Sequence, residues 1–241
     1  AVLESLEVSI EHDEPIILTG DTHHYCRQEF GRAMHIIAGG GGAFLHPARI
    51  ARGGLEPPAG EFPGPIASAA LAMQVPWQIA GGRAGFVVHT VVALMYLPLV
   101  GLRISGHSTL GACITIAALT TFACGMLGGW RQRRAVTIGA LALLCGVWVG
   151  AVPYGLRELV SWATAAGWLG TTLTGGGIGD VFQALLGWVL SIYPATLGFG
   201  TYLMVLTLLG LEQHQAFSAL ASPGYKHTMR LRVRRDGTAI D

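Results

Sequence analysis

Apolar residues follow two patterns along the chain: short runs near its start, and long uninterrupted runs from about residue 84 onward. Residues 15–19 and 34–38 are short apolar runs bounded by charged residues or glycine, which predicts two buried strands. Residues 56–65 (EPPAGEFPGP) are rich in proline and glycine and predict a linker without regular structure. Residues 66–82 are weakly amphipathic, and Trp77 and Arg83 are typical of a helix at a membrane interface.

The long apolar runs predict membrane spans. Residues 84–102, 108–130 and 135–156 contain no charged side chain, and each is close to the roughly 20 residues that cross a hydrocarbon core about 30 Å thick. Residues 159–171 predict a short interfacial or re-entrant helix. Residues 181–211, with Pro194 in the middle, predict one tilted or kinked span. Two shorter spans in that last run are the alternative, so the number of spans is four or five.

The end of the chain returns to an alternating pattern. Residues 227–241 (HTMRLRVRRDGTAID) alternate apolar and polar positions before an Asp-Gly pair, which predicts a β-hairpin. The fold class is therefore mixed, with an α-helical transmembrane bundle flanked by strand segments of a soluble α/β domain. We divide the chain into a soluble part (1–60), a linker with an interfacial helix (61–83), a transmembrane region (84–211) and a return segment (212–241).

Composition agrees with a membrane protein. Charged residues make up 12% of the chain, half of the roughly 25% of soluble domains, and the mean hydropathy is +0.51. The net charge of +1 gives no indication of nucleic-acid binding. The densest short basic loop is RQRR at 131–134, which predicts that this loop is cytoplasmic. With four spans, both soluble ends then lie in the cytoplasm, and the basic tail agrees with this orientation.

Within the spans, polar side chains are few. His89, His107 and Gln183 stand out, and we expect His89 to bond a neighbouring helix and His107 to reach the membrane surface from a span end. Small residues that favour close helix packing are also frequent: Gly111, Ala112, Ala117, Ala118, Gly125 and Gly128.

The stretch GDTHHY, directly after the first predicted strand, is the most distinctive polar motif. Asp21 and His23 are two residues apart in a predicted turn, so an oxygen and a nitrogen ligand can point at one cation such as Zn, Mn or Fe. The spacing alone favours a structural turn, in which Asp21 caps the turn and His23 stacks on Tyr25 or Phe30.

The stretch LTGDTHHYCR resembles the last metal-binding motif of calcineurin-like metallophosphoesterases, usually Gly-His-x-His. Residues 35–49 and 214–238 look like the segments that flank the spans in a membrane-associated, multi-pass branch of that superfamily. The resemblance covers both soluble ends. It implies a hydrolase that cleaves a phosphate ester with two divalent metal ions (Mn, Fe or Zn).

Carried over residue by residue, His23 matches the second histidine of the motif and is implied as a metal ligand. Asp21 stands where the first histidine usually lies, and it either ligates through oxygen or only orients the site. His24 has no counterpart in the motif, and we consider it, with His46, as a contact to phosphate or as support behind a ligand. The glycine run 39–42 predicts either a tight turn close to the metal site or a phosphate-binding loop.

In the superfamily the other motifs, Asp-x-His, Gly-Asp and Gly-Asn-His, lie N-terminal to this last one, and residues 1–19 contain none of them. The resemblance therefore implies the C-terminal fragment of a membrane-anchored phosphoesterase, with the bilayer and a phosphate ester as partners. One turn with two ligands cannot hold two metals, so we expect this chain alone to be inactive. The alternative is a non-enzymatic multi-pass membrane protein, a transporter or scaffold, with a structural turn.

Overall fold

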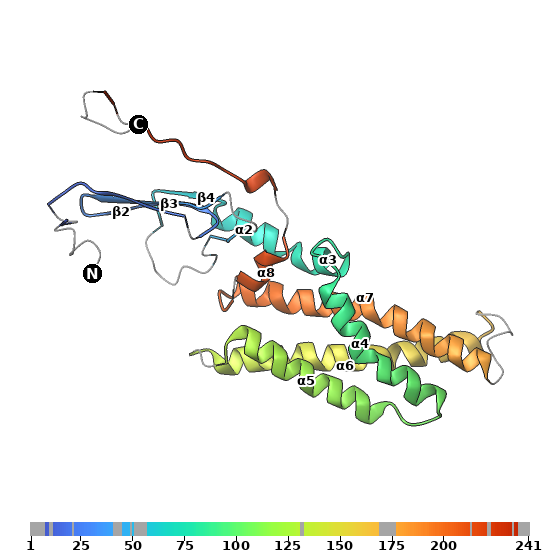
Figure 1. Ribbon diagram of the computed structural model, residues 1–241. Coiled ribbons are helices and arrows are strands. Elements are labelled where there is room, and N and C mark those ends of the chain that lie inside the picture. The colour runs from blue at the N-terminus through green and yellow to red at the C-terminus, as the bar shows by residue number, and fades with distance from the viewer. Residues whose placement is uncertain are drawn as a thin grey trace. The chain divides into compact units, whose positions relative to one another are not determined.

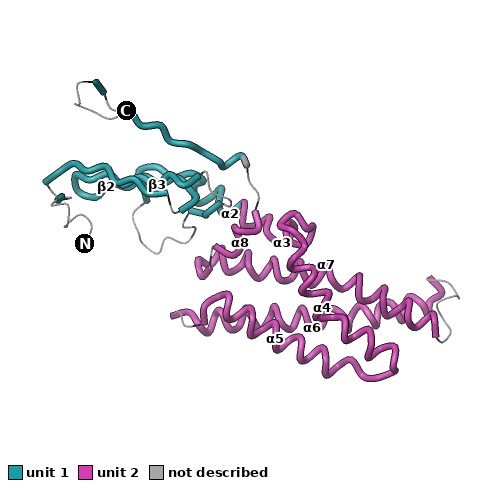
Figure 2. Tube along the Cα trace, in the orientation of Figure 1, with its two compact units in different colours: residues 1–70, 221–241 teal, residues 71–220 magenta. Residues whose placement is uncertain are grey.

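The computed structural model describes residues 8–9, 12–20, 22–40, 45–48, 50, 57–130, 133–168, 177–212, 214–220, 223–232 and 234–235. The chain divides into two compact units, residues 1–70 with 221–241, and residues 71–220 (Figure 2). The first unit holds a small sheet and the second a helical bundle (Figure 1).

The sheet has four strands in the order β1-β3-β2-β4. Strands β1 (Ile16–Thr19) and β3 (Ala33–Ala38) pair in parallel. Their positions match the two strands predicted at residues 15–19 and 34–38. Between them in sequence lies β2 (Tyr25–Phe30), which is antiparallel to β3 through a turn at Gly31, where φ is 61°. The sheet is therefore mixed. Strands β1 and β3 are parallel, and β2, which lies between them in sequence, is antiparallel to β3.

Two features of this unit differ from the sequence prediction. Residues 56–65 were predicted to lack regular structure, but β4 (Gly60–Phe62) lies within them and pairs antiparallel with β2. The pairing comes from a partner more than thirty residues away in sequence, and an edge strand tolerates the prolines beside it because they need not donate hydrogen bonds. The C-terminal hairpin predicted for residues 227–241 is wrong for residues 227–232, which lie in no strand. The Asp236–Gly237 turn lies outside the described residues.

The second unit consists of helices. Two short helices, α2 (Pro65–Ala72, which begins in the first unit) and α3 (Val75–Ala80), replace the single interfacial segment predicted at 66–82. The long helices α4 (Val87–Ile104), α5 (Leu110–Gly128), α6 (Ala135–Ala165) and α7 (Ile178–Leu208) follow. After them come α8 (His214–Ser218) and, in the first unit, the 3₁₀ turn η2 (Pro223–Tyr225).

Helices α4 to α7 are each long and apolar enough to cross a membrane. Only 22% of the residues in the spanning windows of α4 and α5 are buried inside the protein, so most of their apolar side chains face outward. Such a surface suits lipid rather than water. The predicted multi-pass integral membrane protein is confirmed at this level.

The third span is longer than predicted. Helix α6 runs without a break from Ala135 through Arg157 and Glu158 to Ala165, so the separate short helix predicted to begin at residue 159 is wrong. The charged pair ends the apolar run, but arginine and glutamate are good helix formers and do not end the helix. Helix α7 is a single helix across Pro194, as the one-span interpretation of residues 181–211 predicted.

Glycines set the distances between the helices. On α6, a Cβ added at Gly146 would lie 2.1 Å from Thr121 Oγ1 of α5, and one at Gly150 would lie 2.7 Å from the Cys113 carbonyl oxygen. Helix α3 packs on α7 in the same way, since a Cβ at Gly200 would lie 2.7 Å from Pro76 Cα. The predicted helix-packing role is confirmed for Gly128, which faces Ile138 of α6 and Tyr202 of α7, while Gly125 is covered by Trp130 just after its own helix and Gly111 faces open space.

Buried polar groups of the bundle donate to main-chain carbonyls of neighbouring helices. The Tyr96 hydroxyl of α4 donates to Val149 of α6, and the Tyr202 hydroxyl of α7 donates to Cys124 of α5. A ring nitrogen of His89 lies 3.0 Å from the Ala80 carbonyl of α3, which confirms the predicted bond to a neighbouring helix. These bonds satisfy polar groups that would otherwise be costly to bury in an apolar environment.

Candidate functional site

The histidine turn lies between the end of β1 at Thr19 and the start of β2 at Tyr25. The turn is tight, because the His24 N–H donates to the Thr22 carbonyl over 2.9 Å. Gly39, just after β3, makes room for it: a Cβ there would lie 2.2 Å from the Thr22 carbonyl oxygen. The first glycine of the run therefore acts as the close passage that one sequence interpretation predicted. Asp21 lies outside the described residues, as do Gly41 and Gly42.

His23 and His46 are joined by two hydrogen bonds. The His23 N–H donates to His46 Nδ1 over 2.7 Å, and the His46 N–H donates to the His23 carbonyl over 3.2 Å. The two rings are 4.9 Å apart and tilted by 53°. His23 thus stacks on His46 rather than on Tyr25 or Phe30. The segment that carries His46 is itself fixed, since the buried Ala48 N–H donates to Ser68 Oγ of α2 over 3.0 Å.

This geometry decides which nitrogen of His46 carries the proton. Because Nδ1 accepts a hydrogen bond from a backbone N–H, the neutral ring carries its proton on Nε2. Neither nitrogen then offers a lone pair to a cation. The arrangement assigns His46 to the support of the turn, as a partner of His23.

His24 is buried beside the turn, with 9% of its surface exposed. Burial, together with the nearby His46 and His227, lowers its pKa from 6.5 to about 4. The ring is therefore neutral at physiological pH. Its Nδ1 is buried without a hydrogen-bond partner among the described residues.

His227, from the C-terminal segment, is the residue that sequence reasoning missed. It packs against the sheet, where a Cβ at Gly40 would lie 2.2 Å from its Nδ1. Its ring meets Tyr25 and Phe62 edge-on, with centroids 6.0 and 6.2 Å apart. Nothing in the sequence of the basic tail singles out His227. Its contact with the sheet, formed by residues far earlier in the chain, is what distinguishes it.

The face of β2 that carries Tyr25 also carries Arg27, because alternate residues of a strand share a face. The Cβ of Arg27 lies beside Gly60 of β4, and its Nε is buried without a hydrogen-bond partner in the described part of the chain. This face of β2 therefore carries a polar nitrogen that the described residues leave unsatisfied.

The described residues do not form a metal centre on their own. Among them, no group of three or more histidine, cysteine, aspartate or glutamate side chains is arranged to hold a metal ion. Of the sequence-predicted site residues, the structure brings His23, His24 and His46 together and adds His227. Comparison of the chain with protein-family models, curated proteins and solved structures finds no match.

Proposed function

We propose that this chain carries the membrane anchor and one corner of a metal-dependent phosphoesterase, with His23 as a metal ligand. The observation that carries the proposal is the histidine turn at the end of β1, held in shape by His46 and lined by the neutral His24. A turn fixed by its neighbours presents the His23 ring in one orientation, as a metal ligand requires.

The two metals of the proposed activity need more ligands than this turn provides. We assign them to the missing Asp-x-His and Gly-Asn-His motifs, in a segment outside these 241 residues, with Asp21 as a second ligand from the turn. When bound, two metals would polarise a phosphate and activate a water. The four helices would keep the site near a membrane-borne or membrane-proximal phosphate ester. The positions of the basic residues favour a cytoplasmic site.

The test starts from the gene. The open reading frame around this sequence is expected to encode the missing motifs, and their absence would end the proposal. The protein that contains them is then assayed for hydrolysis of bis(p-nitrophenyl) phosphate with added Mn²⁺. We expect His23→Ala to lower the rate by about 100-fold or more. His12→Ala, at an exposed position before β1, is the matched control and keeps the parent rate.

The 241-residue chain alone gives a second, separate result. We expect no metal-dependent hydrolysis from it. Hydrolysis that His23→Ala abolishes would refute the assignment of the remaining ligands to another segment.

A non-enzymatic membrane protein is the second candidate, and one observation favours it. The two hydrogen bonds between His23 and His46 are those of a structural turn. In that case His23→Ala lowers the stability of the sheet, and the longest protein encoded by the gene hydrolyses no phosphate ester. The same assays therefore separate the two functions.

A further inference from the structure

A small cavity lies at one end of the helical bundle, between the end of α4 and the start of α7. Its volume is about 50 Å³, several times the roughly 10–15 Å³ that admits one water molecule. Most of its lining is apolar, but two arginines, Arg103 of α4 and Arg157 of α6, border it together with Thr109 and Gln183. A cavity of this size has room for a single small group.

The helix geometry places both arginines near the membrane surface. Arg103 is in the last turn of α4. Arg157 is 22 residues beyond Ala135, the first residue of α6, which corresponds to roughly 33 Å along a helix that rises 1.5 Å per residue. That distance is close to the thickness of the hydrocarbon core, about 30 Å. Both guanidiniums therefore lie where the phosphates of one lipid leaflet begin.

Exposed aromatic residues lie slightly beyond this level, at the end of α6 and just after it. Trp162, five residues after Arg157, is 55% exposed, and its ring meets that of Trp168, which is 73% exposed, with centroids 5.0 Å apart. Exposed tryptophans gather where the hydrocarbon core meets the headgroups. The cavity thus opens near the interface on this side of the bundle.

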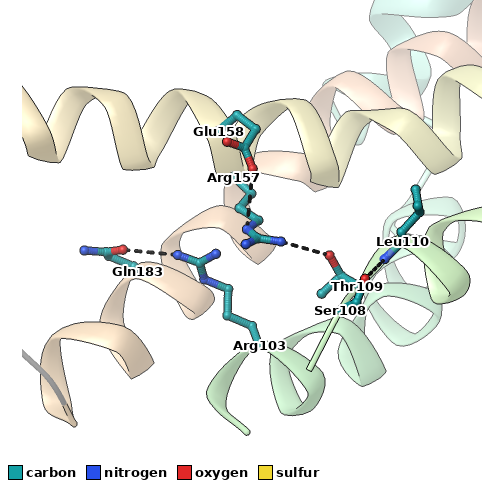
Figure 3. A network of polar contacts seen from close by, with 7 residues as sticks. All are labelled: Arg103, Ser108, Thr109, Leu110, Arg157, Glu158 and Gln183. Carbon is teal, nitrogen blue, oxygen red and sulfur yellow. Dashed lines mark hydrogen bonds and ion pairs between the residues drawn. The ribbon is translucent and has the colours of Figure 1, made fainter. Parts of the chain in front are cut away.

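The two guanidiniums lie near each other and have donors to spare (Figure 3). Arg103 Nη2 donates to Gln183 Oε1 over 3.3 Å, and Arg157 Nη1 donates to Thr109 Oγ1 over 3.4 Å. Both bonds are long. Each guanidinium has five N–H donors, and among the described residues these are the hydrogen bonds that the two make. Most of their hydrogen-bonding capacity therefore remains for a ligand.

The neighbouring carboxylates do not use this remaining hydrogen-bonding capacity. Glu158 Oε1 lies 3.7 Å from Arg157 Nε, and its side chain is 56% exposed. Asp180 attracts Arg103 but is also exposed. An exposed ion pair contributes little. Two like charges beside a small cavity repel each other, and an anion between them would remove that repulsion.

We propose that Arg103 and Arg157 form a binding site for one phosphate group. Guanidinium groups bind phosphate oxygens with paired, charge-assisted hydrogen bonds, and the cavity has room for one such group. The phosphate belongs either to a lipid headgroup of this leaflet or to free inorganic phosphate. The site is formed by the bundle alone and is independent of the histidine turn, so it stands or fails separately from the proposed phosphoesterase.

The test uses the purified 241-residue chain in detergent, with native mass spectrometry for lipid adducts and calorimetry for inorganic phosphate. Phosphatidic acid and phosphatidylglycerol are compared with diacylglycerol, which lacks the phosphate. Binding of the phospholipids alone assigns the source to lipid, and binding of inorganic phosphate as well assigns it to the free anion. Binding of neither, or equal binding of diacylglycerol, overturns the proposal.

Variants locate the site. We expect Arg103→Gln and Arg157→Gln each to weaken phosphate binding by about 10-fold or more, the effect of losing hydrogen bonds to a charged group. Arg133→Gln, exposed in the loop at the other end of the bundle, removes the same charge and is expected to bind as the parent does. If a glutamine variant does not fold, the corresponding lysine variant replaces it. Lysine keeps the charge but loses the paired geometry, so binding weakens measurably. Unchanged affinity in the Arg103 and Arg157 variants, or an equal loss in Arg133→Gln, would overturn the assignment.

Discussion

Replacing Gly146 by alanine tests whether α5 and α6 are in contact through their backbones. The added Cβ would lie 2.1 Å from Thr121 Oγ1, 2.5 Å from the Ala117 carbonyl oxygen and 2.8 Å from the Thr121 nitrogen. Rotation of the threonine side chain relieves the first contact. The other two involve the backbone of α5, so the helices themselves must move apart.

The size of the effect follows from two opposing terms. Overpacking a close contact costs typically about 1–3 kcal/mol, while an alanine in place of glycine inside a helix gains up to about 1 kcal/mol. Gly139 provides the control for the second term, because it is on the same helix and a Cβ there meets nothing within 4 Å. Because both variants gain the helix term equally, we expect Gly146→Ala to be less stable than Gly139→Ala by the overpacking term alone, about 1–3 kcal/mol.

The measurement is reversible unfolding of the purified chain by SDS in mixed micelles. Tryptophan fluorescence follows the bundle, since all six tryptophans of the chain lie in or beside its helices. Both variants are compared with the parent at the same micelle composition. Equal stability of Gly146→Ala and Gly139→Ala would refute the close approach of α5 and α6 at this point.

Three further predictions concern the sheet and the orientation of the chain. In metal-free buffer, the pKa of His24, about 4 when folded and 6.5 when unfolded, makes the unfolded state bind the extra proton. Hydrogen exchange should therefore show that β2 and β3 lose up to about 3 kcal/mol of local stability as the pH falls from 6.5 to 4. Gly40→Ala should displace the His227 ring and increase hydrogen exchange in residues 224–232, because its Cβ would overlap that ring. Cysteines introduced in the loop 131–134 should react with an impermeant reagent from the cytoplasmic face.

Each of these has its own control. His24→Phe keeps a buried ring without the titrating group, and it should flatten the pH dependence; a slope equal to that of the parent would contradict the assignment to His24. Gly20→Ala adds a methyl group where nothing lies within 4 Å and should leave the C-terminal segment unchanged. Equal exchange in both glycine variants would contradict the contact with His227. Labelling of the loop only from the outer face would reverse the orientation.

Only part of the candidate site could be predicted from the sequence. The apolar run before GDTHHY and the motif itself were sufficient to predict β1 and a histidine-bearing turn at its end. The partner of His23 was not predictable, because His46 and His227 reach the turn from distant segments. Their sequence surroundings, a His-Pro pair and a basic tail, carry no sign of that contact.

The sequence by itself determined that this chain spans the membrane, because charge-free runs of about 20 residues have no favourable place in water. It also located strands β1 and β3, but it left open whether residues 181–211 form one span or two. Only the tertiary structure showed that α6 continues through Arg157 and that β4 forms beside prolines. It also showed at which glycines neighbouring helices come into close contact. These features depend on partners distant in sequence. The paired arginines illustrate the difference, since residues 54 positions apart in separate helices meet at one cavity only after the bundle has formed.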